Sequence, residues 1–330
     1  MTEQDRPNLL FIHSDQHNPR VTGCYGDPLV RTPHLDSIAE SGVLFENAYC
    51  PSPICVPSRM SSLTGRFPFE NRVWTNSHIL SSSIPTLAHS MGAAGYRPVL
   101  IGRMHALGPD QLHGYVDRPV GDHSANQLGG SPVDHGFLAR TNGPARVSLE
   151  KSGHGQNAYQ VHDEDVTAAA VEFLKDPGVE PFSLTVGFML PHQPFVARSE
   201  DYSYYFRNMF PPRVSEPFSN ELHPHIKTWR SSCGIEEVGD AETHRARAAY
   251  WALVARMDAM IGQILVALQE SGKADNTLIV YSSDHGEQVG EHGLWWKQTF
   301  YEDSVKVPAL ISWPGHLPEG IRMDQVISSL

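Results

Sequence analysis

The sequence predicts an α/β fold, in which short buried strands alternate with amphipathic helices along a chain of 330 residues. Two observations support this prediction. Several apolar runs have the length of a strand and are bounded by polar or turn-forming residues. Longer segments with helical periodicity lie between these runs, and several of them stop at a glycine. Alternation of this kind is typical of a sheet covered by helices.

The expected strands are the short apolar runs, taken in chain order. They lie at residues 9–14, 43–45, 96–101, 182–189, 277–283 and 308–313. The expected helices lie at residues 33–41, 84–94, 163–175 and 242–271, and a glycine follows three of them. Residues 108–160 and 199–240 are rich in Pro, Gly, His and Tyr. We expect these two stretches to be irregular and to carry function, because long loops in a compact domain usually do.

The composition limits the class of ligand and the compartment. The chain has 25 Lys and Arg against 37 Asp and Glu, a formal net charge of −12, which argues against non-specific binding of nucleic acid. We note no apolar run of membrane-spanning length and no signal peptide before the first strand, so we expect a cytoplasmic protein without membrane contact. The four cysteines show no paired spacing, which fits a reduced compartment.

The most informative motif begins at Cys55 and reads Cys-Val-Pro-Ser-Arg, with Leu-Thr-Gly-Arg following at residues 63–66. Pro57 suits the first turn of a helix, and residues 58–63 can continue that helix. Residue 55 would then lie at the helix N-terminus, where backbone N–H groups favour an anion. For a cysteine alone, the competing interpretation is an inert buried thiol.

This motif resembles the signature of the type I, formylglycine-dependent sulfatases of the alkaline phosphatase superfamily. The resemblance implies a central, mostly parallel sheet with helices on both faces. It also implies that a formylglycine-generating maturation enzyme oxidises Cys55 to an aldehyde, which hydrates to a diol. One diol oxygen attacks the sulfate sulfur, and the other later expels the sulfate. Arg59 is expected beside the hydrate.

Two polar pairs directly follow expected strands. Asp15 and Gln16 come after the first strand, and Asp284 and His285 come after the fifth. Open α/β sheets bind ligands at the carboxyl ends of their strands. For either aspartate alone, a helix N-cap is the competing interpretation.

By resemblance, these four residues and the matured residue 55 hold one divalent metal ion. Ligands that are mostly oxygen suit Ca²⁺. Gln16 replaces the commoner second Asp, and His285 replaces the Asn of some branches. The lower ligand charge leaves Mn²⁺ and Mg²⁺ open.

Three further motifs resemble the family's sulfate pocket. They are Gly-Arg-Met-His at residues 102–105, Pro-His-Gln-Pro at residues 191–194 and Trp-Lys-Gln at residues 296–298. The resemblance implies that Arg103, in place of the usual Lys, and Lys297 bind the sulfate. His105 and His192 are then the acid–base and leaving-group candidates. Sulfuryl transfer needs such cations and a proton donor, because charge spreads over the sulfate oxygens and onto the leaving oxygen.

The resemblance leads to one expected activity and two alternatives. We expect hydrolysis of a small organic sulfate ester, and residues 83–89 and 105–114 look like the corresponding parts of choline sulfatases. A phosphonate monoester or phosphodiester hydrolase of the same superfamily is the first alternative, and an inactive binding homologue is the second. We expect residues 1–330 to form one catalytic α/β domain without the family's smaller C-terminal part. The oligomeric state, a homo-oligomer included, stays open.

Overall fold

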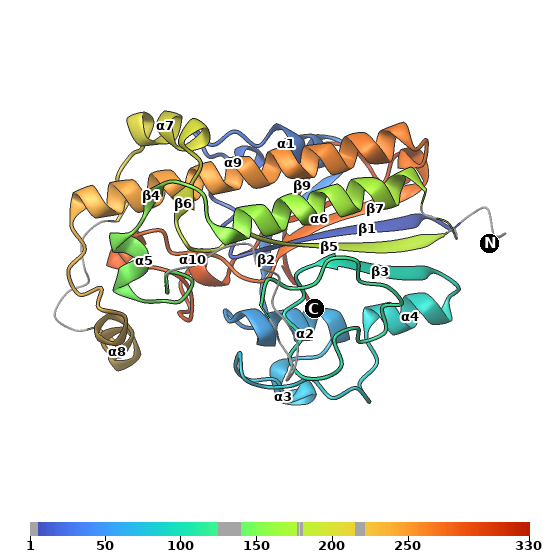
Figure 1. Cartoon of the computed structure of the whole chain (residues 1–330), viewed down its shortest axis with the longest axis horizontal. Coiled ribbons are helices and arrows are strands. Elements are labelled where there is room, and N and C mark those ends of the chain that lie inside the picture. The colour runs from blue at the N-terminus through green and yellow to red at the C-terminus, as the bar shows by residue number, and fades with distance from the viewer. Residues whose placement is uncertain (1–5, 125–139, 177, 179–180, 215–221) are drawn as a thin grey trace.

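The computed structural model describes residues 6–124, 140–176, 178, 181–214 and 222–330, and it confirms the α/β class. A seven-stranded sheet lies between two layers of helices (Figure 1). In spatial order its strands are β3 (Arg97–Gly102), β5 (Phe182–Pro191), β1 (Asn8–Asp15), β7 (Thr277–Ser283), β8 (Ala309–Ser312), β2 (Val43–Tyr49) and β9 (Ile321–Ser328). A small second sheet pairs β4 (Gly153–His154) with β6 (Val196–Ala197).

The direction of the strands gathers several chain segments at one edge of the sheet. Strands β3, β5, β1 and β7 are neighbours and all run parallel. Strand β8 runs antiparallel to both β7 and β2, while β2 and β9 are parallel. The sheet is therefore mostly parallel, as expected. The residues that follow β3, β5, β1 and β7 emerge at the same edge, where parallel sheets place ligands.

Helices cover both faces of the sheet (Figure 1). One layer contains α1 (Pro33–Glu40), α6 (Ala158–Lys175) and α9 (Asp240–Glu270), and the other contains α2 (Cys55–Thr64), α3 (Pro68–Asn71) and α4 (Leu87–Ala93). The remaining helices are α5 (Arg146–Glu150), α7 (Ser199–Asn208), α8 (Pro224–Cys233) and α10 (Glu302–Val305). Every residue of β5 is buried, as expected for a strand covered on both faces.

Helix α9 corrects the expectation that the chain has no apolar run of membrane-spanning length. With 31 residues it is long and apolar enough to cross a membrane by length and composition alone. The most apolar part of this helix is largely buried inside the protein. The helix packs there against α6, α7 and β5. Side chains such as Trp251, Met257 and Ile261 belong to the main hydrophobic core. The apolar run is thus used for core packing.

The two stretches expected to be irregular contain more regular structure than predicted. The first contains α5, β4 and the start of α6, which begins earlier than expected because the Asn157 side chain accepts from the backbone N–H groups of Tyr159 and Gln160. The second contains α7 and α8, and α7 buries Tyr202 and Tyr205. Residues 125–139 and 215–221 of these stretches lie outside the described residues.

The segment that follows β3 is held in place by a close approach of its backbone to β5. The Arg103 N–H donates to the Gly187 carbonyl at 2.8 Å. A Cβ atom at Gly187 would lie 1.9 Å from the Arg103 carbonyl oxygen, so only glycine fits there. Gly102 has φ +94°, and a Cβ on it would lie 2.2 Å from the Gly187 oxygen. The two glycines therefore let residues 103–105 cross directly over β5.

Candidate active site

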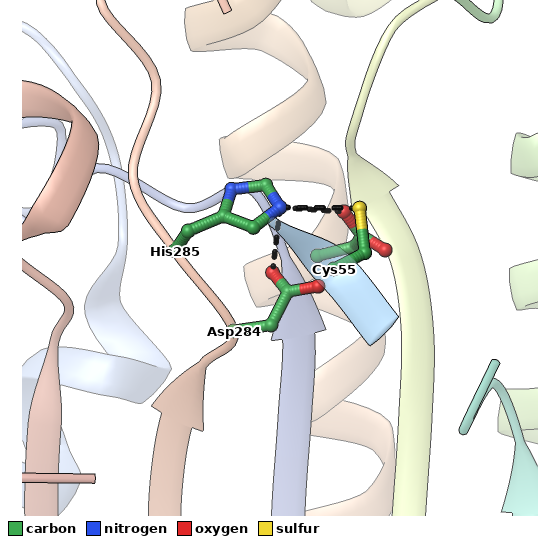
Figure 2. A group of neighbouring side chains, drawn as sticks. Cys55, Asp284 and His285 are labelled. Atoms are coloured by element: carbon green, nitrogen blue, oxygen red, sulfur yellow. Dashed lines mark hydrogen bonds and ion pairs between the residues drawn. The ribbon is translucent and has the colours of Figure 1, made fainter. Parts of the chain in front are cut away.

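The N-terminus of α2 meets the carboxyl ends of β1 and β7. The Cys55 sulfur lies 3.2 Å from His285 Nε2, which lies 3.5 Å from Asp284 Oδ1 (Figure 2). With Asp15, the last residue of β1, these residues offer four possible ligand atoms within 4.8 Å of one another. All four residues are buried. Topology alone thus brings together positions that are far apart in the sequence.

The start of α2 confirms the helix that the motif predicts. Ile54 is extended, the helix begins at Cys55 with Pro57 in its first turn, and Gly65 ends it with φ +63°. The Asn76 side chain accepts from the free Val56 N–H at 2.9 Å. Ser58 Oγ donates to the Asp284 carbonyl at 2.5 Å and ties the helix to the end of β7. Residue 55 is therefore fixed at a helix N-terminus.

Arg59 lies one turn further along α2 and is fully buried. Its Nε donates to Asp284 Oδ2 at 2.8 Å, and its Nη2 donates to Asp15 Oδ2 at 3.2 Å. The guanidinium thus joins the two carboxylates from behind. Burial and Cys55 act to raise the pKa of Asp15, but Arg103, His192 and Arg59 outweigh them and hold that pKa well below its usual range. Asp15 is therefore an ionised ligand candidate.

The residues present fit a divalent cation. Asp15 Oδ1 is buried and has no hydrogen-bond partner among the residues that the structure describes. His285 Nδ1 lies 3.0 Å from the Gly286 carbonyl and donates to it, so Nε2 is the ring nitrogen that would bind an ion. Two carboxylates, one imidazole and residue 55 form a ligand set for a hard or borderline ion.

Gln16 lies directly beside this group. Its backbone N–H donates to Asp284 Oδ1 at 2.9 Å, and its side-chain oxygen accepts from Lys297 Nζ. Its side-chain nitrogen donates to Gln193 Oε1 at 2.6 Å and also to Glu287. In this arrangement the amide oxygen of Gln16, the atom expected to bind the metal ion, accepts from Lys297 Nζ.

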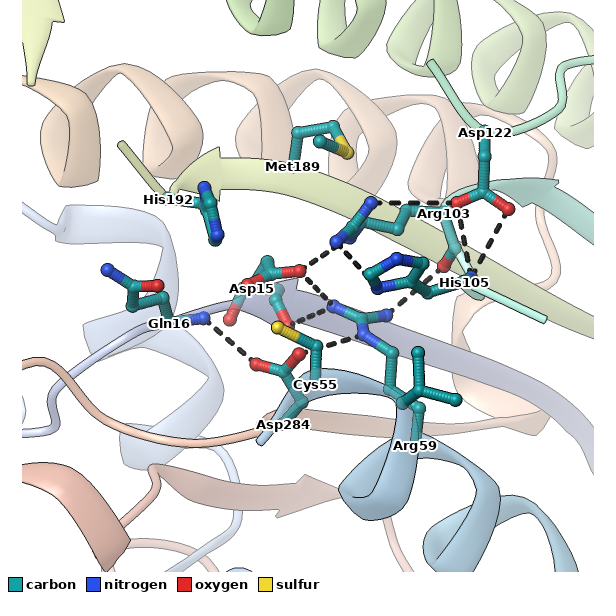
Figure 3. Close-up of polar contacts among 12 residues, drawn as sticks. Asp15, Gln16, Cys55, Arg59, Arg103, His105, Asp122, Met189, His192 and Asp284 are labelled. Atoms are coloured by element: carbon teal, nitrogen blue, oxygen red, sulfur yellow. Dashed lines mark hydrogen bonds and ion pairs between the residues drawn. The ribbon is translucent and has the colours of Figure 1, made fainter. Parts of the chain in front are cut away.

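Arg103 and His105 approach residue 55 from the end of β3 (Figure 3). Arg103 Nε contacts Asp15 Oδ2 at 2.5 Å, and Arg103 Nη2 contacts His105 Nδ1 at 2.8 Å. A guanidinium can only donate, so His105 Nδ1 accepts and the neutral ring carries its proton on Nε2. The Cys55 sulfur is hydrogen-bonded by His105. His105 therefore presents a donor to residue 55.

His192 approaches from the opposite side, just beyond β5 (Figure 3). Its Nδ1 lies 2.6 Å from the Gln193 carbonyl and must donate, so Nε2 offers a lone pair. Burial and then the charge of Lys297 lower the pKa of His192, which favours the neutral ring. Burial opposes a thiolate at Cys55, but the charges of Lys297 and His285 and the hydrogen bond donated by His105 lower its pKa well below the ordinary value. The surroundings thus favour an anion at residue 55.

All ten residues singled out in the sequence lie in this one cluster. Two further residues were missed. Buried Glu287 accepts from the backbone N–H of Trp296 at 2.6 Å, and burial raises its pKa to about 7. Glu287 lies two residues after His285, and this position shortly after the end of β7 could have marked it as a site residue. Buried Asp122 accepts from the backbone N–H of His105 and lies in a stretch without any pattern that marks it.

Comparison with known proteins gives a consistent picture. A family model described as Sulfatase matches residues 7–330. The choline-sulfatase of Rhizobium meliloti (strain 1021) is 33% identical over 333 residues, which cover 95% of this chain and 64% of that protein. Arylsulfatase K of Bos taurus is 30% identical over 342 residues, covering 98% of this chain and 61% of the relative. The chain thus spans less than two thirds of the length of these two relatives.

The solved structure of the phosphonate monoester hydrolase of Agrobacterium radiobacter superposes with a TM-score of 0.79. It is 22% identical in sequence, and the match covers 98% of this chain and 71% of that one. At this identity the likeness shows a shared fold. The match of the family model over nearly the whole chain shows more, and the chain belongs to the Sulfatase family.

Proposed function

We propose that this protein hydrolyses a small organic sulfate ester to an alcohol and inorganic sulfate, with the consumption of one water. The observation that carries the proposal is the environment of residue 55. Its sulfur lies at a helix N-terminus and within a four-ligand group, and His105 donates a hydrogen bond to it. This environment favours negative charge where the reaction develops it.

The Cys55 sulfur stands in for the oxygens of an aldehyde hydrate. A formylglycine at this position would supply the nucleophilic oxygen, and a divalent ion on Asp15, Gln16, Asp284 and His285 would polarise the sulfate. We propose Ca²⁺ as that ion, with Mn²⁺ and Mg²⁺ as alternatives, since the donors are mostly oxygen.

The side chains of this protein would hold and move protons and charge. Arg59 contacts both ligand carboxylates from behind and offsets their negative charge. Arg103 and Lys297 place positive charge beside the sulfate oxygens. His105 donates a hydrogen bond from Nε2, and the free lone pair on His192 Nε2 can take the proton of the attacking hydroxyl and return it to the leaving oxygen.

The relatives suggest which esters to test first. The similar proteins are named for choline sulfate and aryl sulfate substrates. The competing activity, hydrolysis of phosphonate monoesters or phosphodiesters, is favoured by the fold of the Agrobacterium enzyme. Sequence identity is higher to the choline-sulfatase, at 33%, than to the phosphonate hydrolase, at 22%, and this favours sulfate.

The deciding experiment is a hydrolysis panel on protein produced with the maturation enzyme and supplied with Ca²⁺, Mn²⁺ or Mg²⁺. The panel contains choline sulfate, 4-nitrophenyl sulfate, a phenylphosphonate monoester and bis(4-nitrophenyl) phosphate. We expect the highest kcat/KM for a sulfate ester. A clear preference for the phosphonate or the diester would overturn the proposal. Cys55→Ala serves as the control, and any activity that it retains comes from another source.

A further inference from the structure

Two catalytic candidates, His105 and His192, lie on loops that approach residue 55 from opposite sides (Figure 3). One loop follows β3 and the other follows β5. Their correct separation matters, because misplacement by about 1 Å can cost roughly 10²-fold in rate. Buried polar residues outside the site connect the two loops.

On the His192 side, the connection is made by Asp163 of α6. The carboxylate accepts from the Met189 N–H at 2.9 and 3.0 Å and from the Leu190 N–H at 2.8 Å. Met189 and Leu190 are the residues of β5 just before the turn that carries His192. Asp163 is fully buried, so these bonds are shielded from water. The carboxylate thus fixes the backbone from which His192 projects.

On the His105 side, the connection is made by Asp122. Its two oxygens accept from the His105 N–H at 3.1 and 3.2 Å, and one of them lies 2.5 Å from Arg118 Nη2. His105 has φ +61°, a left-handed conformation that is uncommon for a residue with a side chain. Arg103 Nη1 lies 3.9 Å from the same carboxylate. Asp122 therefore holds the strained backbone that presents both Arg103 and His105.

His162 of α6 joins the two sides. Its Nδ1 lies 2.9 Å from Asp163 Oδ1, and its Nε2 lies 2.8 Å from the carbonyl of Gly121, the neighbour of Asp122. Both partners can only accept, so the ring satisfies both when it carries two protons. Burial opposes this charge, but the hydrogen bond and charge of Asp163 outweigh burial and raise the pKa of His162. The two acceptors therefore favour the imidazolium form of His162.

We propose that Asp122, His162 and Asp163, here called the polar bridge, set the separation of His105 and His192 across residue 55. They are positioning residues, since each acts through the backbone of a histidine loop or through another bridge residue. The inference rests on the proposed function for its catalytic meaning. Its structural content, the coupling of the two histidine loops, stands independently.

The first test is the kinetics of His162→Gln on the best ester of the panel. Glutamine is similar in length and can donate to one acceptor but cannot donate to one from each end. We expect kcat to fall about 10- to 100-fold with KM changed less than about twofold. The sulfate-binding side chains stay in place, whereas His105 and His192 shift relative to residue 55. The matched control is His154→Gln on β4, an exposed histidine that should keep wild-type kinetics. Wild-type kcat in His162→Gln would overturn the proposal.

The second test needs no turnover and uses protein labelled with ¹⁵N-histidine. Long-range ¹H–¹⁵N spectra distinguish Nδ1–H from Nε2–H tautomers, with signals assigned by single His→Gln variants. In the wild type we expect Nε2–H for His105, Nδ1–H for His192 and two protonated nitrogens for His162. In His162→Gln the signals of both other rings should shift or broaden, with His154→Gln again as the control. Unchanged His105 and His192 signals, or a neutral His162 in the wild type at pH 6, would overturn the proposal.

Asp122→Asn is the companion variant if His162→Gln does not fold. It keeps the shape of the side chain and should disturb the His105 signal first. If the wild type hydrolyses no ester but the spectra respond as expected, the proposed function fails and the polar bridge stands. If turnover falls and the spectra do not change, the bridge fails and the proposed function stands.

Discussion

Replacement of Arg103 by alanine should lower both the stability of the fold and the rate of turnover. The side chain is 7% exposed, and its Nε lies 2.5 Å from the fully buried Asp15 carboxylate. The same guanidinium donates to His105 Nδ1 at 2.8 Å. One substitution therefore removes the nearest cation of a ligand carboxylate and the group that fixes the tautomer of His105.

The structure sets the size of each effect. Breaking a buried ion pair by removing one partner costs about 3–5 kcal/mol. Arg59 stays 3.2 Å from the same oxygen of Asp15, so we expect a loss near the low end, about 3 kcal/mol in the free energy of unfolding. Loss of one preorganised donor at the developing charge lowers turnover roughly 10²- to 10³-fold. Arg103→Lys should recover part of the stability but less of the rate, because the charge returns without the planar fork.

The sign of the pH dependence follows from Asp15. Its folded pKa lies below its unfolded value, so its contribution is present above pH ~4 and is lost as the pH falls through the folded pKa. Arg103 is one cause of that depression. The stability difference between wild type and Arg103→Ala should therefore be largest near neutral pH and should shrink in acid. A bound divalent ion should also reduce the difference, because it compensates Asp15 in place of the guanidinium.

Urea denaturation at pH 7 and at about pH 2, with and without added metal, measures the stability, because the contribution of Asp15 is lost only below its unfolded pKa of ~4. Initial rates on the best ester measure turnover. The control is Arg97→Ala, whose partner Asp117 lies 3.5 Å away and is half-exposed. Such a pair should contribute about 0–1 kcal/mol. Wild-type stability and wild-type turnover of Arg103→Ala would refute the argument that this guanidinium belongs to the site.

Three further predictions concern the same site. Peptide mass spectrometry should show Cys55 converted to formylglycine in active protein, and fully active protein with unmodified cysteine would rule out the chemistry. Chelation should remove activity and lower the melting temperature together, since an ion bound only by the folded state stabilises it; undiminished activity in metal-free protein would contradict this. Burial acts to raise the pKa of Asp122, but Arg118, Arg103 and His105 lower it to about 2. Asp122→Asn should therefore lower the free energy of unfolding by about 2 kcal/mol at neutral pH, as measured by urea denaturation. The difference from wild type should vanish between pH 4 and pH 2.

The strands that carry the site could be predicted because they are covered on both faces. The β5 segment is buried throughout, and its continuous apolar run is visible in the sequence. Strand β9 is mostly exposed and mixes charged with apolar residues, so no pattern of alternation marks it. Helix α7 was missed because residues 199–240 are rich in Pro, Gly, His and Tyr, whereas two of its tyrosines are buried in the core and the helix packs against α9. Tertiary contacts decide such segments, and a single sequence does not contain them.

The site residues could be predicted as members of one cluster, but their contacts could not. The resemblance implies that Arg59 lies beside the hydrate, and the structure adds that its guanidinium contacts Asp15 and Asp284. Asp122 could not be predicted at all, because its role depends on the path by which residues 103–122 return to β3. That path begins at the close crossing over Gly187 and returns where the Asp117 and Val120 carbonyls accept from the Leu100 and Gly102 N–H groups. A sequence pattern does not encode these contacts.

The charge of the site also explains why substrate class and substrate identity are separate problems. The chain carries a formal net charge of −12, yet three buried cations, Arg59, Arg103 and Lys297, accompany two ligand carboxylates around residue 55. A divalent ion would add to this local positive charge, so the site attracts anions that the rest of the surface repels. Sulfate monoesters, phosphonate monoesters and phosphodiesters are all tetrahedral monoanions, and this charge pattern serves each of them. Discrimination among these classes must therefore come from side chains around the second substituent of the central atom, which is an oxygen in a sulfate monoester, a carbon group in a phosphonate and a second ester group in a phosphodiester. Side chains that contact the alcohol half select the individual ester.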